Sequence, residues 1–220
     1  MKKGYNIAID GPAGAGKSTI ARRIAKELNF IYVDTGAMYR AMALYLIRKG
    51  MEPADTKGIA GACREAEISI KYQDGEQVVL LDGENVNAYL RTEEVGNMAS
   101  YSSMVPEVRE KLVELQQKLA ASADVVMDGR DIGTVVLPGA DVKVYLTASS
   151  ATRAKRRYLE LQEKGETADL AVIEQDIIDR DYRDMHREHS PLRQAEDAVL
   201  VDSSDLTIEE VVERIKSLCG

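Results

Sequence analysis

The first residues that could do chemistry lie near the amino terminus, where an apolar segment ends at Asp10 and a glycine-rich loop follows. Residues 11–18 read GPAGAGKS, which matches GxxxxGK[ST] at every required position. Small residues let successive backbone N–H groups curl around phosphate oxygens, and a helix that follows adds its dipole. Lys17 could reach terminal phosphates and Ser18 could approach Mg²⁺. The residues assigned to this phosphate loop are Gly11, Pro12, Ala13, Gly14, Ala15, Gly16, Lys17, Ser18 and Thr19.

A phosphate loop by itself does not distinguish a kinase from a GTPase or a motor. A GTPase should also carry an Asn-Lys-x-Asp guanine reader, and the chain has none. The 29 Lys and Arg against 37 Asp and Glu give a formal charge of −8, which disfavours a binder of nucleic acid or anionic membranes. A small-molecule kinase is favoured, and a non-enzymatic nucleotide switch remains the alternative from another class.

Two arginine-containing segments are candidates for binding a phosphorylated acceptor. Arg40 lies in VDTGAMYRA, one turn into an expected helix, and Arg130 and Asp131 follow Asp128 in MDGRDIGTVV. Arginine suits phosphate because its planar fork makes bidentate contacts, and a phosphate acceptor brings a second polyanion into the site. Asp128, at the end of an apolar segment, would help to organise magnesium. A solvated helix arginine at 40 and a salt-bridged turn at 130–131 are the alternatives.

A third cluster, RAKRR at 153–157, places Arg153, Arg156 and Arg157 on one face of a helix. These arginines could close over the transferred phosphate as a lid. A solvated basic face balanced by Glu160 and Glu163 is the alternative.

The fourth cluster continues an apolar helix face into charged residues. In residues 173–191, Arg180, Asp184 and Arg187 fall within about 80° of the preceding isoleucines on a helical wheel. A merely solvated face would not usually continue a core face, so these charges are expected to point into a cleft. A second apolar stripe, Ile178, Tyr182 and Met185, leaves open which face points inward.

The remaining reactive side chains are assigned ordinary structural roles. His186 and His189 are interpreted as surface or cap histidines rather than metal ligands or bases. Cys63 and Cys219 have no CxxC spacing, which gives no sign of a zinc site or a disulfide framework. No apolar segment approaches the roughly 18 residues of a membrane helix, and the amino terminus lacks a signal-peptide pattern. We therefore expect a cytoplasmic protein, with a monomer as the default.

Five apolar segments predict buried strands that would position these groups. Such strands, alternating with helical patterns, are typical of a parallel sheet covered on both faces. Ligands bind such sheets at the carboxyl ends of the strands, where we expect Asp10, Asp34 and Asp128. The segments are residues 6–10, 30–34, 124–128, 142–146 and 198–202.

Helices are expected between the strands, beginning directly after the phosphate loop. Residues 36–50 predict a helix with Thr35 as N-cap, and residues 106–120 predict another that begins with proline. Thr207 and Glu210 form a capping box at the start of the last helix.

One segment interrupts the alternation of strands and helices. Residues 68–90 carry Asp-Gly pairs at 74–75 and 82–83, which are strong hairpin signals between alternating strands. Residues 60–100 therefore predict an antiparallel insertion rather than an independent domain.

Taken in order along the chain, these motifs resemble the bacterial cytidylate kinases of the nucleoside monophosphate kinase group. The resemblance covers essentially the whole chain, which is far more specific than a phosphate loop alone. The matching segments are IDGPAGAGKST, DTGAMYR, RTEEVGNMAS, DGRDIGTVVLP, ELQEKG and RDYRDMHREHSPL.

The resemblance implies an α/β, three-layer P-loop kinase fold with a five-stranded parallel sheet. It further implies an antiparallel hairpin insertion in the monophosphate-binding region and a short helical lid, all within a single domain. The expected parts are a core of about 1–59, 101–147 and 190–220, an insertion of about 60–100, and a lid with its following helix of about 148–189.

The implied reaction is transfer of the γ-phosphate of ATP to CMP or dCMP with Mg²⁺, in pyrimidine nucleotide metabolism. Lys17, Arg130, Arg153, Arg157 and Arg187 would be catalytic. The substrate-binding residues carried over are Thr35, Arg40, Arg130 and Arg187 for the monophosphate, Ser100, Arg109 and Asp131 for the cytosine edge, and Arg180 and Asp184 for the sugar.

Two positions depart from the usual pattern of the family. Thr35 stands where serine is common and keeps the hydroxyl. Ser18 stands where glycine is common, and because glycine has no side chain to bind a metal, the resemblance by itself does not imply a direct Ser18–Mg²⁺ contact. Kinases of UMP, AMP or shikimate are the alternatives within the same class.

Overall fold

The computed structural model describes residues 4–73 and 75–219. The chain divides into two compact units. The first is built on Ile31–Val125, and the second on Tyr5–Phe30 together with the chain from Val126 onward. Each unit is described by itself.

The main sheet has five strands in the order β2-β6-β1-β7-β8. Pairing is parallel between β1 and β7 and between β7 and β8, with Ile9 opposite Val144 and Leu146 opposite Val201. The predicted five-stranded parallel sheet is confirmed, since all five apolar segments form its strands. These are β1 (Asn6–Asp10), β2 (Ile31–Asp34), β6 (Val125–Gly129), β7 (Val142–Thr147) and β8 (Val199–Asp202).

The expectation that all five strands are buried is wrong for β8. Val199 is 39% exposed and Leu200 is 50% exposed, while Val201 is fully buried. The reason is topological, because β8 is the last strand in the order and has one strand neighbour, β7. Every residue of β1 and β6 is buried, as expected for interior strands.

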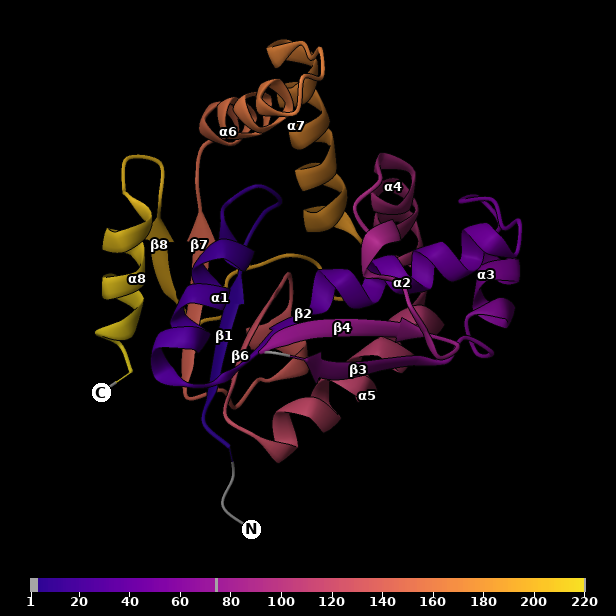
Figure 1. Cartoon of the computed structure of the whole chain (residues 1–220), viewed down its shortest axis with the longest axis horizontal. Coiled ribbons are helices and arrows are strands. Elements are labelled where there is room, and N and C mark those ends of the chain that lie inside the picture. Colours follow the sequence, from indigo (N-terminus) through magenta and orange to yellow (C-terminus); the bar gives the residue numbers. More distant parts are fainter. Residues whose placement is uncertain (1–3, 74, 220) are drawn as a thin grey trace. The chain divides into compact units, whose positions relative to one another are not determined.

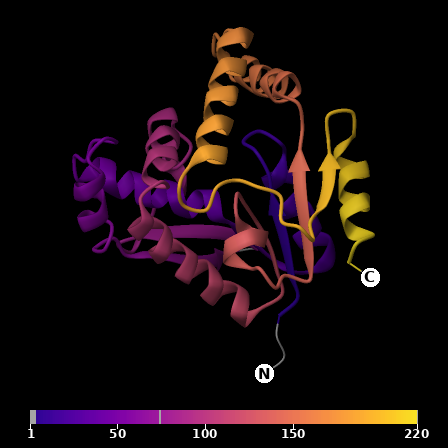
Figure 2. The ribbon, with the colours of Figure 1, turned by 180° about the vertical axis from the view of Figure 1, so that it is seen from behind.

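Four α-helices among the described residues belong to the second unit. Helix α1 (Lys17–Leu28) follows the phosphate loop and packs beside α8 (Ile208–Lys216), while α6 (Ser150–Glu163) and α7 (Leu170–His186) pack against each other beyond the end of β7 (Figure 1; Figure 2). The predicted capping box of α8 is confirmed, because Thr207 Oγ1 accepts from the Glu210 N–H and Glu210 Oε2 accepts from the Thr207 N–H.

The first unit contains the remaining helices and the predicted antiparallel insertion. Strands β3 (Ile68–Gln73), β4 (Glu76–Leu81) and β5 (Glu84–Asn85) form a three-stranded antiparallel sheet. The turn at 82–83 is confirmed, since both residues have positive φ, whereas Asp74 of the other turn lies outside the described residues. The helices are α2 (Thr35–Arg48), α3 (Thr56–Ala62), α4 (Glu93–Ser102) and α5 (Pro106–Ser122), with the single turn η1 (Asn87–Tyr89).

The cap of α2 differs from the prediction. Thr35 is the first helical residue, and the N-cap is Asp34, whose Oδ1 accepts from the Ala37 N–H at 2.9 Å. A carboxylate satisfies the free amide of the first turn and also faces the positive end of the helix dipole. Asp34 therefore lies at the end of β2, as expected, and also caps the start of α2.

Within residues 4–73 and 75–219, no helix has both the length and the apolar composition needed to cross a membrane.

Candidate active site

The phosphate loop has the backbone geometry that its glycines were expected to allow. Gly11, Gly14 and Gly16 all have positive φ, of 148°, 76° and 87°. At Gly11 any Cβ would collide with the carbonyl of Leu146 on the neighbouring strand β7. Gly16 is the left-handed cap from which α1 begins. The loop therefore turns sharply against the sheet and leads directly into a helix N-terminus, where backbone amides can meet phosphate.

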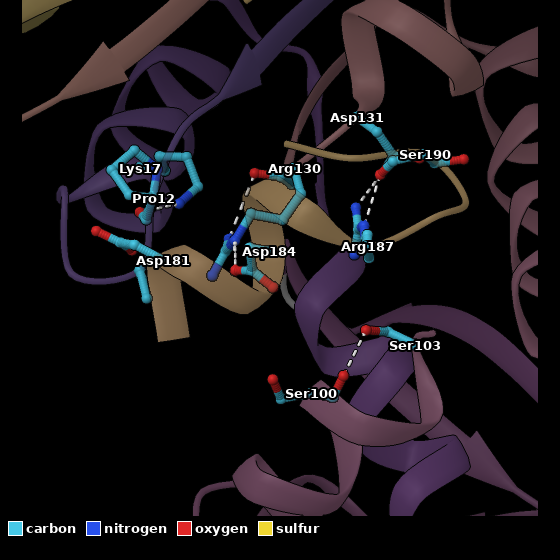
Figure 3. A network of polar contacts seen from close by, with 12 residues as sticks. Pro12, Lys17, Ser100, Ser103, Arg130, Asp131, Asp181, Asp184, Arg187 and Ser190 are labelled. Carbon is cyan, nitrogen blue, oxygen red and sulfur yellow. Dashed lines mark hydrogen bonds and ion pairs between the residues drawn. The ribbon is translucent and has the colours of Figure 1, made fainter. Parts of the chain in front are cut away.

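Lys17 lies over this loop. Its ammonium donates to the Pro12 carbonyl at 2.7 Å, and the residue is only 6% exposed (Figure 3). Burial and the nearby charge of Arg130 lower the pKa of Lys17 to about 7, against the opposing effect of Asp128, Asp10 and Asp184. A buried cation of this kind gains from an anionic ligand, which would restore its charged form.

Asp128 and Asp10, two strand-end carboxylates of the second unit, have different contacts. Asp128, at the end of β6, accepts from Ser18 Oγ at 3.0 Å. Both oxygens of Asp10, at the end of β1, accept from backbone amides, of Ile132 at 2.8 Å and Gly133 at 2.7 Å. Burial raises the pKa of Asp10 to about 6, although these two amide bonds act to lower it. Asp10 therefore lies at the end of β1, as expected, and both of its carboxylate oxygens hold a neighbouring backbone segment.

The backbone that Asp10 holds is η2 (Ile132–Val136), a single π-helical turn. This turn follows directly after Arg130 and Asp131, two of the predicted substrate residues. A π-turn is an uncommon conformation that often occurs at functional sites. Asp10, the residue directly before the phosphate loop, is thus bonded to the backbone that follows Arg130 and Asp131. No sequence pattern indicated this link.

Ser18 and Asp128 are the groups best suited to magnesium. Mg²⁺ prefers oxygen ligands and usually takes one or two protein oxygens together with phosphates and waters. The paired hydroxyl and carboxylate fit that requirement. In the described part of the chain no group of three or more His, Cys, Asp or Glu residues could hold a metal by itself.

Arg130 and Asp184 form a buried ion pair across β6 and α7. Arg130 Nε donates to Asp184 Oδ2 at 2.8 Å, and the two side chains are 21% and 8% exposed (Figure 3). Burial alone would raise the pKa of Asp184, but the charges of Arg130, Arg180 and Arg187 outweigh it and hold this pKa below its ordinary value. Asp184 therefore stays ionised, with Arg130 as its partner.

Arg187 and Asp131 form a second charged pair nearby. Arg187 Nη2 lies 3.8 Å from Asp131 Oδ1, and Arg187 Nε donates to the Ser190 carbonyl at 2.6 Å (Figure 3). Arg187 is not on the helical stripe that we expected, because α7 ends at His186 and Arg187 has extended backbone. Ser190 has φ of 50°, so the chain turns back sharply and its carbonyl holds the guanidinium.

The structure decides which face of α7 points inward. Asp184 is 6% exposed, whereas Ile178, Tyr182 and Met185 are 45%, 63% and 43% exposed. The charged stripe of Arg180 and Asp184 is therefore the inner face, as interpreted, and the second apolar stripe faces solvent. Both histidines are exposed, and His186 stacks on Tyr182, in agreement with surface roles.

The three arginines of α6 do not share one environment. Arg153 is 5% exposed and bonds to oxygens of Ala148, Ala13 and Asp181. Arg156 donates to the Ser203 carbonyl at 2.7 Å. Arg157 is 50% exposed and pairs with Glu160 at 3.2 Å, which is the solvated arrangement considered as the alternative. Only Arg153 contacts the phosphate loop, through the Ala13 carbonyl.

Four predicted substrate residues belong to the first unit. Thr35 is buried at the start of α2, and Arg40 is half-buried one turn later, with Nη1 close to Gly36. Ser100 on α4 is 8% exposed, and its hydroxyl has no hydrogen-bond partner among the described residues, while its carbonyl accepts from Ser103 (Figure 3).

Arg109 on α5 is 5% exposed and lies over the ring of Tyr39, 5.7 Å from its centroid. This cation–π contact would hold the guanidinium in place. Tyr39 was not predicted as part of the site. The only sequence signal for it was its position beside Arg40.

Comparison with known proteins decides the family. The model of the cytidylate kinase family matches residues 7–219. The chain belongs to the cytidylate kinase family. Its match begins on β1 and includes the phosphate loop and every predicted site residue, so the family assignment does not depend on the loop alone.

Full-length relatives in the family agree with this assignment. The chain is 51% identical over 218 residues to the cytidylate kinase of Caldicellulosiruptor bescii, covering 99% of this chain and 96% of that protein. It is 52% identical over 218 residues to the cytidylate kinase of Desulfitobacterium hafniense, covering 99% and 94%. A kinase activity and ATP as co-substrate follow from membership of the family.

A solved structure supports the fold independently of close sequence similarity. The crystal structure of a gluconokinase from Sinorhizobium meliloti aligns over 100% of this chain and 94% of its own, with a TM-score of 0.51 and 14% identity. At this identity the likeness concerns the fold alone, and it places the cytidylate kinase fold among kinase structures.

Proposed function

We propose that the protein transfers the γ-phosphate of ATP to CMP or dCMP, giving ADP and CDP or dCDP. The observation that carries the proposal is the family match over residues 7–219, which includes a complete phosphate loop and the acceptor-side arginines together. A nucleotide switch would need no second set of phosphate-binding cations. The substrates are free nucleotides, and we propose that the enzyme acts on them in the cytoplasm as a monomer.

On the donor side, the amides of residues 11–16 and the helix N-terminus of α1 bind the ATP phosphates. Lys17 leaves the Pro12 carbonyl for the terminal phosphates, whose charge favours its protonated form. Ser18 and Asp128 would hold Mg²⁺, which supplies charge neutralisation between the β- and γ-phosphates.

On the acceptor side, Thr35, Arg40, Arg130 and Arg187 hold the monophosphate. The buried ion pairs support this role, because Asp184 and Asp131 keep Arg130 and Arg187 oriented before a phosphate arrives. Arg180 and Asp184 bind the sugar. Ser100, Arg109 and Asp131 read the cytosine edge, and the unpartnered Ser100 hydroxyl is consistent with an outside ligand.

The transfer step needs positioned charge more than covalent help. The second pKa of a phosphate monoester is about 6, so the acceptor is already a nucleophilic dianion near neutral pH. A general base is therefore unnecessary, which agrees with two exposed histidines. Arg153 and Arg157 neutralise charge that develops on the transferred group while the lid excludes water.

The test is ADP release from ATP and Mg²⁺ with CMP, dCMP, UMP, AMP, GMP and shikimate offered separately. Strong turnover with CMP and dCMP alone supports the proposal. Turnover with another acceptor would keep the donor site and remove the base-reading assignment. The absence of any acceptor-dependent turnover would favour the nucleotide switch.

Base reading has its own variant. The Asp131 carboxylate would accept from cytosine N4, and Arg109 would donate to O2 or N3, whereas uracil presents mismatched groups to both. Asp131→Asn should therefore reduce the CMP-over-UMP ratio of kcat/KM by about tenfold or more. Steady-state kinetics with both acceptors measures it, and an unchanged ratio would remove Asp131 from base reading.

A further inference from the structure

Arg153 is held by oxygens from three separate segments. Its Nε donates to the Ala148 carbonyl at 2.9 Å, Nη1 to the Ala13 carbonyl at 2.9 Å, and Nη2 to Asp181 Oδ2 at 2.6 Å. Ala13 belongs to the phosphate loop and Asp181 to α7. The aliphatic stem also packs on the loop, since a Cβ at Gly14 would lie 3.4 Å from that of Arg153.

Asp181 is a buried carboxylate that the proposed reaction does not otherwise use. Its side chain is 14% exposed and that of Arg153 is 5% exposed, so little solvent screens the pair. The other carboxylate oxygen, Oδ1, is buried without a hydrogen-bond partner in the described part of the chain. Burying a charge in this way is costly unless an opposite charge compensates it, and here the compensating group is Arg153.

Holding α6 and α7 together does not require this pair. Ser150 Oγ donates to Glu174 Oε1 at 2.7 Å, which independently joins the start of α6 to the second turn of α7. The distinctive effect of Asp181 is therefore on the orientation of one guanidinium. Of the five N–H donors of an arginine, three make the bonds described above, which leaves two for a ligand.

We propose that Asp181 is a positioning residue that fixes the Arg153 guanidinium against the phosphate loop, with its remaining N–H groups directed to the transferred phosphoryl group. Asp181 touches neither nucleotide and acts through Arg153. This inference rests on the proposed function, because it needs a phosphoryl group in transfer. It explains why a lid arginine is already ordered at the loop, whereas Arg157 on the next turn of α6 is exposed.

The first test is Asp181→Asn, which keeps the shape of the side chain and removes its charge. We expect kcat to fall about 10- to 30-fold, because a misplaced catalytic group can cost about 100-fold. The Kd of MgATP should stay within about threefold, since ATP is bound by the loop amides and Lys17. The acceptor KM should also stay within about threefold, since the acceptor is bound by residues such as Arg40 and Arg187. The matched control is Asp176→Asn, an exposed position on α7 with the same change of charge, which should leave kcat within about twofold.

A double-mutant cycle decides between positioning and general destabilisation. Arg153→Ala combined with Asp181→Asn should be no slower than Arg153→Ala alone, because Asp181 has nothing left to position. Multiplied losses in the double variant would overturn the proposal. Parallel rises in acceptor KM and MgATP Kd for Asp181→Asn would also overturn it.

A second variant guards against poor folding of Asp181→Asn. Asp181→Glu keeps the charge and should retain more of the wild-type kcat than the asparagine variant. Equal losses for both variants would contradict a role that depends on the charge.

The wild-type acceptor panel separates this inference from the proposed function. Activity with CMP and an additive cycle would reject only the positioning role. Activity with a different acceptor and a non-additive cycle would reject only the acceptor assignment. No acceptor-dependent turnover would reject both.

Discussion

The phosphate loop and the α6–α7 region both carry candidate phosphate-binding cations, but they are held together in different ways. In the loop region Lys17 bonds to the Pro12 carbonyl and Asp10 to two backbone amides, and the Ser18 hydroxyl donates to Asp128. In the α6–α7 region the contacts join charged side chains from distant positions, such as Arg130 with Asp184. The Lys17 bond joins residues five positions apart in one short segment, whereas the Arg130–Asp184 pair joins residues 54 positions apart and exists only after the chain has folded.

The largest effect is expected in the loop region. Lys17→Met should lower kcat by ~10³-fold, because removing one preorganised electrostatic group from a catalytic site costs about 10²–10³. The protein should remain folded, since the buried ammonium that is removed has a pKa lowered to about 7 and is partly desolvated at a cost. Steady-state kinetics and thermal unfolding measure both properties. If the Lys17→Met variant loses activity only because it is less stable, the prediction that the substitution acts locally in the loop is contradicted.

The next effect concerns the side-chain network and should appear in stability. Asp184→Asn leaves Arg130 buried without its charge partner, which should cost about 3 kcal/mol in the free energy of unfolding. Urea denaturation of this variant beside Asp176→Asn measures it, and equal stabilities of the two would contradict the prediction.

The same carboxylate gives a pH dependence. The pKa of Asp184 is lower in the folded state than in the unfolded state, so its contribution is present above the unfolded pKa of about 3.8 and is lost as pH falls through the folded value. The stability difference between wild type and Asp184→Asn should therefore shrink on acidification below pH about 4.

A smaller effect is expected in the loop region, where Lys17 should take up a proton when MgATP binds. Lys17 has a pKa of about 7 in the protein, and the triphosphate should raise it towards the ordinary range. At pH about 8 the free protein holds Lys17 mostly neutral, so MgATP binding should take up close to one proton per site, and at pH about 6 almost none. Calorimetry in buffers of different ionisation enthalpy reports the uptake. Lys17→Met is the control and should abolish it.

The smallest effect is expected at Arg157. Its exposed pair with Glu160 is worth little, so Arg157→Ala should leave thermal stability unchanged and lower kcat about three- to tenfold. The acceptor KM should change less than kcat. The reverse pattern would make Arg157 an acceptor-binding residue, and a loss as large as that of Arg153→Ala would remove the distinction between the two positions.

Much of the fold followed from local patterns. The five apolar segments became the five strands, and the capping box of α8 and the turn at 82–83 formed where predicted. Periodicity and turn chemistry act over a few residues, so the sequence displays them directly. The exposure of β8 was missed because it depends on the position of β8 at the end of the sheet. That position is set by the pairing of all the strands and cannot be inferred from the sequence of one strand.

The site was predictable in kind but not in its pairings. Residue types at strand ends and helix faces indicated the candidate side chains. They could not show that Asp10 clamps η2, that Asp34 caps α2, or that Asp181 pairs with Arg153 28 positions away. These partners are chosen by tertiary packing. Arg187 was misplaced for a related reason, since helical periodicity does not reveal that α7 ends one residue earlier.

The Asp10 clamp has a consequence for anyone recombining this enzyme with distant kinases. Asp10 precedes the loop, and its amide partners at Ile132 and Gly133 lie more than a hundred positions later. At Gly133 an added Cβ would lie 3.4 Å from Asp10 Oδ2 and 3.2 Å from Lys143 Cδ, so the partner position tolerates little bulk. A phosphate-loop segment taken from a distant kinase would lack the η2 turn that its own strand-end residue contacts. Residues 6–19 and 128–136 should therefore be exchanged as a single unit, and crossover points between them avoided.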